Sequence, residues 1–269
     1  MGIFNLKNKK VVIIGGSGAL CSAIGKGLGD EGAEIALCDI SDSRETLNKL
    51  KENNIKAKSY YIDVTNIEEI QKCKNKVLED FERIDVLING VGGNLKEATT
   101  SKDLNFFNIP GTAFETVIKL NLLSVVYASQ IFGEVLAKNE KGGSIINISS
   151  MNAFRPLTSI PGYSASKAAV SNFTQWLAVY FALEINKKIR VNAIAPGFFL
   201  TEQMKYMHYD NKGNPTERAK KVLLHTPMGR YGEPEELVGA CVWLASEASS
   251  FVTGTVIPID GGFNAYSGV

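Results

Sequence analysis

The stretch that decides the fold lies near the start of the chain, at residues 10–39, KVVIIGGSGALCSAIGKGLGDEGAEIALCD. An apolar run, KVVIIG, leads through a glycine-rich turn into a helix-like segment, and a second apolar run, EIALCD, follows. Short apolar runs bounded by turn residues are typical of buried strands, and a helix between two of them is typical of a parallel βαβ unit. The chain is therefore predicted to begin strand, helix, strand.

The same alternation continues to the end of the chain. Five more apolar runs follow, separated by longer amphipathic segments: KSYYID, DVLING, GSIINIS, IRVNAIA and TVIPID. This pattern predicts an α/β fold, a Rossmann-type doubly wound parallel sheet of about seven strands with helices on both faces. No internal repeat or linker divides it, so residues 1–269 are expected to form a single dinucleotide-binding and catalytic domain. Two longer segments, near 92–114 and 198–234, follow predicted strands and are expected to be substrate loops.

Composition excludes several other classes of protein. The 269 residues are 45% hydrophobic and 21% charged with a net charge of +1, so no basic surface for nucleic acid or for an acidic membrane is expected. The four cysteines and two histidines are scattered, so neither a disulfide framework nor a metal site is expected. No run reaches the ~18 apolar residues of a membrane span. The amino terminus does not resemble a signal peptide, and we expect a cytoplasmic protein.

The glycine-rich turn has two interpretations. Its main-chain N–H groups can bind a pyrophosphate at the amino end of the following helix, and we expect Gly15, Ser17, Ala19 and Leu20 to contact a dinucleotide there. The glycines can instead serve only the tight packing of a strand against a helix. On this segment alone the two interpretations have equal weight.

Asp39 ends the second predicted strand, 24 residues after Gly15. A carboxylate there can accept hydrogen bonds from both adenosine ribose hydroxyls and would repel a 2′-phosphate, which favours NAD over NADP. The only nearby cation after this strand is Arg44. The alternative is that Asp39 caps a helix beginning near Ser41 or Asp42.

A second informative stretch, residues 147–170, reads NISSMNAFRPLTSIPGYSASKAAV. Tyr163 and Lys167 lie four residues apart, on one face of a predicted helix, so the ammonium can lower the pKa of the phenol and make it a general acid and base. Ser150 follows a predicted strand and can hydrogen-bond a carbonyl oxygen on which charge develops. The alternative, an ordinary exposed helical pair, is weakened by this serine.

These motifs, in this order and spacing, resemble the short-chain dehydrogenase/reductase family over essentially the whole chain. The resemblance implies that Asp63 and Val64 contact adenine, and that Asn89 and Gly90 border the cofactor. It further implies that Asn121 completes a proton relay through a water next to Lys167. The nicotinamide carboxamide would contact four residues after the sixth strand: Pro196, Gly197, Phe199 and Thr201.

The chain departs from the family pattern at two places. Ile14, Ala19 and Cys21 stand where the family's turn has a threonine and its last two glycines, and Gly90 replaces an asparagine. Alanine and cysteine are small, so cofactor binding is expected to persist, with an altered affinity. Tyr163 and Lys167 are expected to contact the cofactor as well.

The substrate is expected to be a polyhydroxylated acid. Arg155 lies between Ser150 and Tyr163, where its guanidinium could grip a carboxylate, or could instead pair on the surface or bind loop carbonyls. Besides Ser150, Tyr163 and Arg155, the residues expected to contact substrate are Asn94, Asn152 and His225.

Longer matching text, including HTPMGRYGEPEELVGA, resembles the D-mannonate oxidoreductase (fructuronate reductase) branch of the family. This resemblance implies the NAD-dependent interconversion of D-fructuronate and D-mannonate in hexuronate catabolism, and a homotetramer. The alternatives are another sugar-acid ketoreductase such as gluconate 5-dehydrogenase, an oxoacyl-carrier-protein reductase, and a non-catalytic NAD(H)-binding sensor or scaffold.

Overall fold

Seven parallel strands form one sheet in the order β3-β2-β1-β4-β5-β6-β7, which confirms the predicted topology. The computed structural model describes residues 2–201 and 204–268. The strands are β1 (Lys10–Ile14), β2 (Glu34–Asp39), β3 (Ala57–Tyr61), β4 (Val86–Asn89), β5 (Gly143–Ile148), β6 (Ile189–Pro196) and β7 (Val256–Ile259). Ile14 at the end of β1 pairs with Cys38 of β2 and with Asn89 of β4. The strand order reverses beside β1, and ligands of open α/β sheets bind at the carboxyl ends next to such a switch point.

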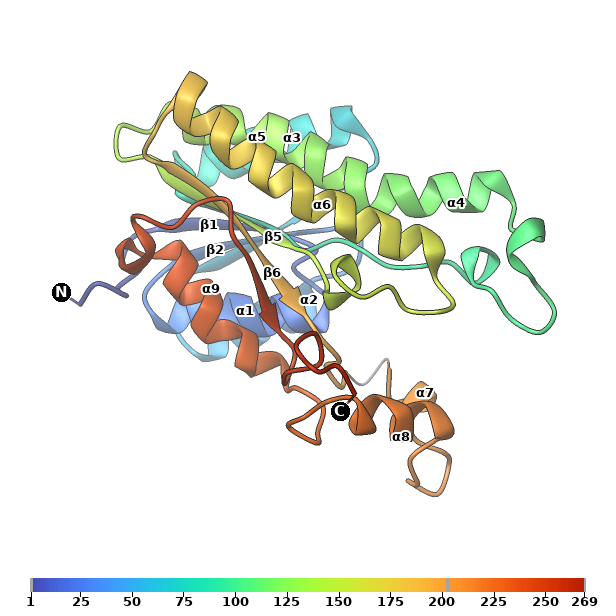
Figure 1. Cartoon of the computed structure of the whole chain (residues 1–269). Helices are drawn as coiled ribbons and strands as arrows, with labels where there is room; N and C mark the ends of the chain where they lie inside the picture. Colours follow the sequence, from blue (N-terminus) through green and yellow to red (C-terminus); the bar gives the residue numbers. More distant parts are fainter. Residues whose placement is uncertain (1, 202–203, 269) are drawn as a thin grey trace.

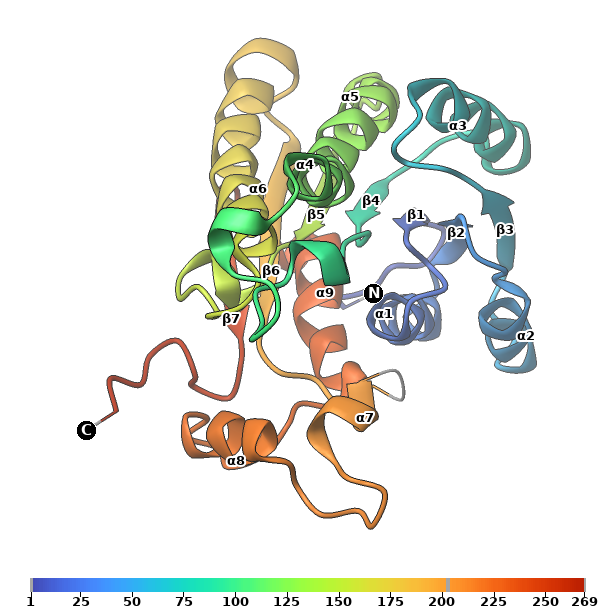
Figure 2. The same cartoon turned by 90° about the vertical axis from the view of Figure 1, so that its right-hand side faces the viewer.

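Helices cover both faces of this sheet. Two views show α1, α2 and α9 on one face and α3, α5 and α6 on the other (Figures 1 and 2). The helices are α1 (Ala19–Asp30), α2 (Arg44–Glu52), α3 (Ile67–Phe81), α4 (Gly111–Ile118), α5 (Ser124–Ala137), α6 (Pro161–Tyr180), α7 (Lys205–His208), α8 (Glu217–Leu224) and α9 (Val238–Ala245).

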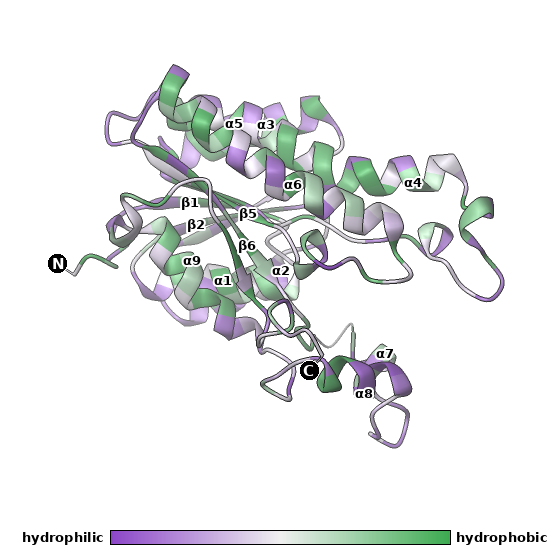
Figure 3. Cartoon of the chain, viewed as in Figure 1, coloured by the Kyte–Doolittle hydropathy of each residue, from purple (hydrophilic) through white to green (hydrophobic). Residues whose placement is uncertain are grey.

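The core follows from the alternation of side chains along each strand. Val11 and Ile13 of β1 pack with α1 and α9, and Val12 and Ile14 pack with α3, α5 and α6 on the opposite face. All four are buried, because successive side chains of a strand point to opposite faces and both faces are covered. Colouring by hydropathy shows this apolar interior between helices whose polar residues lie outside (Figure 3).

A π-helical turn, Lys119–Leu123, joins α4 and α5 into one helical stretch, Gly111–Ala137. By length and composition this stretch could cross a membrane, a test that buried core helices also pass. The expectation that no run reaches ~18 apolar residues still holds, because polar residues such as Glu115, Lys119 and Glu134 interrupt the stretch. Its apolar residues pack inside the protein: Val117, Phe132 and Leu136 are fully buried. A π turn inside a helix redirects side chains and is frequent at functional sites.

The two long segments lie where they were expected, after β4 and β6. The first carries short 3₁₀ turns, Lys96–Ala98 and Phe106–Asn108, before α4 begins. The second carries α7 and α8, which extend beyond the sheet (Figure 1). We call residues 204–234 of this segment the lid.

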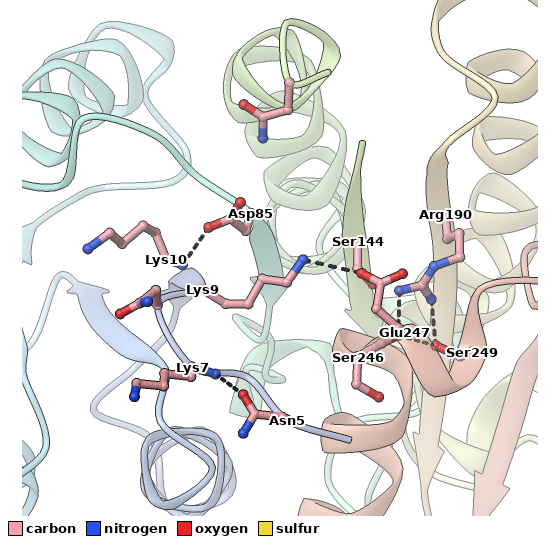
Figure 4. Close-up of polar contacts among 12 residues, drawn as sticks. Asn5, Lys7, Lys9, Lys10, Asp85, Ser144, Arg190, Ser246, Glu247 and Ser249 are labelled. Atoms are coloured by element: carbon pink, nitrogen blue, oxygen red, sulfur yellow. Dashed lines mark hydrogen bonds and ion pairs between the residues drawn. The ribbon is translucent and has the colours of Figure 1, made fainter. Parts of the chain in front are cut away.

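The amino ends of the strands are fixed by a separate set of polar contacts (Figure 4). The main-chain N–H of Lys10 donates to Asp85 Oδ2 at 2.8 Å, which ties β1 to the start of β4. The Arg190 guanidinium donates to Ser249 Oγ at 2.7 Å and to the Leu244 carbonyl at 2.8 Å, which ties β6 to the end of α9. Burial lowers the pKa of Arg190. These contacts lie at the edge of the sheet opposite the glycine-rich turn and hold the strands in register.

Candidate active site

Ser150 and Tyr163 meet at the carboxyl end of β5. Ser150 follows the strand and is 8% exposed, and its Oγ accepts a hydrogen bond from the Asn152 N–H at 3.2 Å. Tyr163 lies in the first turn of α6, where the Ser150 hydroxyl is near enough to lower the pKa of its phenol. The Asn152 N–H uses one of the two lone pairs of the Ser150 hydroxyl, so the serine proton remains able to donate to an oxygen. The structure therefore joins the two groups that the sequence placed thirteen residues apart.

Lys167 lies beside this pair but is held by the main chain. Its Nζ is 5.6 Å from the centre of the Tyr163 ring and donates to the Ile148 carbonyl at 2.8 Å. Burial lowers the pKa of Lys167 to about 8, and burial raises the pKa of Tyr163, although the Ser150 hydrogen bond opposes that rise. The pKa of the phenol is therefore raised by burial, whereas the sequence predicted that Lys167 would lower it; the group that opposes the rise is Ser150.

Lys167 should leave a signature in the pH dependence of stability. Because its folded pKa is lowered from 10.5 to about 8, the unfolded chain binds more protons between these values, and the free energy of unfolding should rise with pH there. We expect the difference in unfolding free energy, parent minus Lys167→Met, to be flat below about pH 8 and to rise by up to about 3 kcal/mol at higher pH. Urea unfolding at several pH values measures this, with exposed Lys187→Met as the control. A difference that stays flat up to pH 10.5 would show that Lys167 keeps its ordinary affinity for the proton.

Asn121 anchors the other side of the site. It is completely buried in the π-helical turn. Its Oδ1 accepts from the Gly93 N–H at 3.0 Å, and its Nδ2 donates to the carbonyls of Gly93 and Val117 at 2.7 and 2.8 Å. A Cβ at Gly92 would lie 2.7 Å from Asn121 Oδ1 and 2.9 Å from Lys167 Nζ, so this glycine lets both groups approach the end of β4. The relay water implied for Asn121 stays a prediction.

The glycine-rich turn has the geometry of a pyrophosphate cradle. Gly15 has a φ of +82°, and a Cβ there would lie 3.0 Å from the main chain of Gly90 and Val91, so the turns after β1 and β4 touch. α1 begins at Ala19 after Gly18, without a side-chain cap or an acidic residue in its first turn. Uncapped N–H groups at a helix amino terminus attract an anion, which suits the roles predicted for Ala19 and Leu20. The role of Ser17 stays a prediction, because its N–H already donates to Asp39.

Asp39 lies at the end of β2 beside this turn. Its Oδ2 accepts from the Ser17 N–H at 2.9 Å and its Oδ1 from the Ser41 N–H at 2.8 Å. The alternative that Asp39 caps the next helix was wrong, because α2 begins only at Arg44 with Ser43 as its N-cap residue. Arg44 is exposed and pairs with Asp42, so the nearest cation is already neutralised.

Cys21, from the first departure from the family pattern, and Gly90, the second departure, share one space. A Cβ at Gly90 would lie 2.1 Å from Cys21 Sγ, so the cysteine thiol fills the space next to residue 90. With a glycine at position 21, a larger side chain at position 90 would fill the same space from the other side. The sequence showed both replacements, but only the structure shows that they compensate each other.

This coupling predicts the behaviour of a variant pair. We expect Gly90→Ala to lower the free energy of unfolding by about 1–3 kcal/mol, since the added methyl overpacks against Cys21. Adding Cys21→Ala should restore most of the loss, because it removes the sulfur. Urea unfolding of the parent, both single variants and the double variant gives the coupling. Strictly additive losses would mean that the two positions do not share this space.

Asn89, which was predicted to border the cofactor, uses its side chain in other contacts. Asn89 donates to Ser129 Oγ at 3.1 Å and to Asn147 Oδ1 at 2.9 Å, and Asn147 donates to Thr174 Oγ1. This buried network joins β4 and β5 to α5 and α6. The sequence analysis missed Asn147, although a polar residue inside an apolar strand was a signal for it.

The remaining cofactor candidates are positioned mainly through their backbones. Asp63 Oδ1 accepts from the N–H and the hydroxyl of Thr65, and Val64 is buried. Phe199 packs in the core with α1 and α9, so only its main chain can reach a nicotinamide. Pro196 ends β6, the Gly197 N–H donates to the Ile259 carbonyl, and Thr201 precedes the lid. Their contacts with nicotinamide stay predictions.

The residues predicted to contact substrate do not all converge. Asn152 Oδ1 accepts from the Leu157 N–H at 2.9 Å and organises its own loop. Asn94 donates to the Leu95 carbonyl and to Thr99 Oγ1, and its Oδ1 is buried without a partner in residues 2–201 and 204–268. His225 is exposed at the end of α8 and donates to the Lys221 carbonyl.

Two further features bear on the substrate residues. A cavity of about 540 Å³ lined by Asn152, Thr100 and Phe106 adjoins Pro161, Ser164, Ala165 and Ala168 of α6, the face of that helix away from Tyr163. Arg155 is exposed and its Nε donates to the Asn264 carbonyl at 2.7 Å, which is the loop-carbonyl alternative. That contact uses one of five guanidinium donors.

Comparisons with known proteins cover nearly the whole chain. Residues 17–264 match the family model described as enoyl-(acyl carrier protein) reductase. An uncharacterized oxidoreductase of Haemophilus influenzae is 46% identical, across 98% of this chain and 96% of that protein. The 2-dehydro-3-deoxy-D-gluconate 5-dehydrogenase of Dickeya dadantii is 33% identical, across 98% of this chain and 99% of that protein. The crystal structure of a candidate D-mannonate oxidoreductase from Haemophilus influenza, with bound NAD, has a TM-score of 0.91 at 46% identity and covers 98% of both chains.

Proposed function

The chain belongs to the short-chain dehydrogenase/reductase family, whose members are NAD(P)-dependent oxidoreductases, and from that premise we propose that it reduces D-fructuronate with NADH to D-mannonate and catalyses the reverse oxidation. The observation that carries the chemistry is the Ser150–Tyr163 hydroxyl pair beside the buried ammonium of Lys167. The substrate class is supported by the sugar acids in the relatives' names and by Arg155 on the loop between the two hydroxyls. We propose that residues 1–269 act as one domain in the cytoplasm.

The residues of the chain divide the work of the reaction. A bound nicotinamide supplies or accepts the hydride at the carbinol carbon. Ser150 donates its proton in a hydrogen bond to the substrate oxygen, while one of its lone pairs accepts from the Asn152 N–H and fixes the hydroxyl in place. Tyr163 gives its phenolic proton to that oxygen in reduction and takes it back in oxidation. Its raised pKa keeps the phenol protonated, which suits the reducing direction.

Lys167 contributes as a partly desolvated cation. Its hydrogen bond to the Ile148 carbonyl fixes the ammonium near the Tyr163 ring, and the absence of a Cβ at Gly92 lets the ammonium lie close to the end of β4. We propose that Lys167 binds the nicotinamide ribose from this position and returns a proton to Tyr163 after each reduction. The non-catalytic sensor or scaffold alternative loses its basis, because Ser150, Tyr163 and Lys167 are all present and adjoining.

The coenzyme is proposed to be NAD rather than NADP. Asp39 presents its carboxylate at the end of β2, and Arg44, which could bind a 2′-phosphate, is paired with Asp42. A carboxylate next to a phosphate dianion is unfavourable at any dielectric constant of a protein surface.

A substrate panel tests this function. Rates of NADH and NADPH oxidation are measured with D-fructuronate, 5-keto-D-gluconate and an oxoacyl thioester. We expect D-fructuronate with NADH to give the highest kcat/KM. Preference for 5-keto-D-gluconate would favour the gluconate 5-dehydrogenase alternative, and turnover of the thioester alone would overturn the sugar-acid proposal.

We further propose that the protein is a homotetramer in which α6 contributes to a contact between copies. Trp176, Val179 and Leu183 recur at helical spacing along α6 and the turn that continues it, and they are 56%, 58% and 75% exposed. Apolar side chains grouped in this way mark an interaction surface. Light scattering should give four times 29.2 kDa for the parent, and a lower mass for Val179→Lys combined with Leu183→Lys. A parent that elutes as a monomer would contradict the proposal.

A further inference from the structure

The carboxyl-terminal segment after β7 forms a rigid turn. Asp260 Oδ1 accepts from the Gly262 N–H at 2.9 Å and its Oδ2 from the Asn264 N–H at 2.8 Å, so one carboxylate closes the turn at two points. Gly261 and Gly262 have φ values of +62° and +88°, a conformation that glycine adopts without strain. We call residues 260–265 the terminal turn.

The terminal turn contacts the lid and residues 196–201, which include the residues predicted to contact nicotinamide and which we call the nicotinamide segment. The Gly197 N–H donates to the Ile259 carbonyl at 2.9 Å just before the turn, and the Phe263 ring lies edge-to-face on Phe198 at 5.3 Å. The Met228 N–H, after α8, donates to the Gly261 carbonyl at 3.1 Å. The turn therefore joins the segment after β6 to the end of the lid.

A further contact reaches the loop between Ser150 and Tyr163, which we call the catalytic loop. Arg155, between Ser150 and Tyr163, donates its Nε to the Asn264 carbonyl at 2.7 Å, 109 residues along the chain. Within residues 2–201 and 204–268, the Nη atoms of Arg155 have no hydrogen-bond or ion-pair partner. A guanidinium held by its Nε loses rotational freedom, and its Nη donors remain for a bidentate ligand such as a carboxylate.

We propose that the terminal turn is a positioning clasp: the Asn264 carbonyl orients Arg155 so that its Nη atoms bind the substrate carboxylate, while the turn holds the catalytic loop against the nicotinamide segment. This deepens the proposed function and rests on it for the carboxylate. Arg155 is then a specificity-determining residue, and Asp260 is a positioning residue that acts through it. A hydrogen bond from Arg155 to a loop carbonyl was predicted as the alternative to substrate binding. In this proposal, the same hydrogen bond supports substrate binding.

Steady-state kinetics of four variants test the clasp. Asp260→Ala removes both hydrogen bonds that close the turn, and Arg155→Met removes the guanidinium. We expect each to raise KM for the sugar acid at least tenfold while kcat changes less than threefold, and the double variant to be no worse than Arg155→Met alone. Asp85→Ala is the matched control, because its carboxylate also accepts a main-chain N–H, that of Lys10, but at the opposite edge of the sheet, and its KM should stay within twofold of the parent value.

The same variants separate failure of the clasp from failure of the proposed function. If KM is unchanged in Asp260→Ala, or if the two increases multiply in the double variant, the clasp is overturned even though sugar acids are substrates. If the parent reduces no sugar acid, the proposed function fails and the carboxylate part of the clasp fails with it. In that case, thermal unfolding tests the contact between Arg155 and the terminal turn. Losses in Tm that do not add in the double variant support this contact, and additive losses overturn it.

Discussion

We expect Tyr163→Phe to lower kcat about 1,000-fold while the affinity for NADH changes little. The substitution removes only the phenolic oxygen, so the ring remains beside Lys167 and α6 keeps its packing. Without that oxygen no group of comparable acidity is in place to protonate the substrate alkoxide, and general acid catalysis contributes 10²–10⁴-fold in enzymes. Stopped-flow rates of NADH oxidation and fluorescence titration of NADH measure the two quantities.

Tyr180→Phe is the matched control for this substitution. Tyr180 ends the same helix and stacks on Trp176 with ring centroids 5.2 Å apart, a contact that phenylalanine keeps. Its kcat should equal that of the parent. If Tyr163→Phe retained more than a tenth of the parent kcat, another group would have to be the acid.

The second large effect is expected for Asp39→Asn, which should shift the ratio of kcat/KM for NADH over NADPH by about 100-fold toward NADPH. Asparagine has nearly the same shape and keeps an oxygen acceptor for Ser17 or Ser41, but it removes the negative charge that a 2′-phosphate would meet. Initial rates with both coenzymes measure the ratio. Asp30→Asn, which removes a surface carboxylate paired with Lys26, is the control and should leave the ratio unchanged. A parent that already prefers NADPH would contradict the assigned role of Asp39.

The sequence was sufficient to predict the sheet because each strand is a short apolar run between polar helices. All seven runs became strands, and the glycine turn and the Ser150, Tyr163 and Lys167 motif lie at carboxyl ends, as the βαβ pattern requires. Local spacing decides these features. The Tyr163 to Lys167 interval, for example, places both on one face of α6 whatever the rest of the chain does.

Features that depend on contacts between distant segments could not be read from the sequence. The compensation between Cys21 and Gly90 and the hydrogen bond from Arg155 to Asn264 join positions far apart in the chain. The pKa of Tyr163 is raised where the sequence predicted a lowering, because burial, which no local motif reports, is its largest cause. Asn89 was assigned to the cofactor by resemblance, whereas its carboxamide is used in a buried network.

The central claim is that this chain transfers hydride between NAD and a sugar acid, and isotope transfer tests it most directly. D-Fructuronate is mixed with NADH that carries deuterium at the transferred position of C4, and the acid product is analysed by mass spectrometry and NMR. The account predicts D-mannonate with one deuterium on the carbon that was the ketone. NADH oxidised without deuterium in the acid, or no consumption of any keto acid offered, would contradict it.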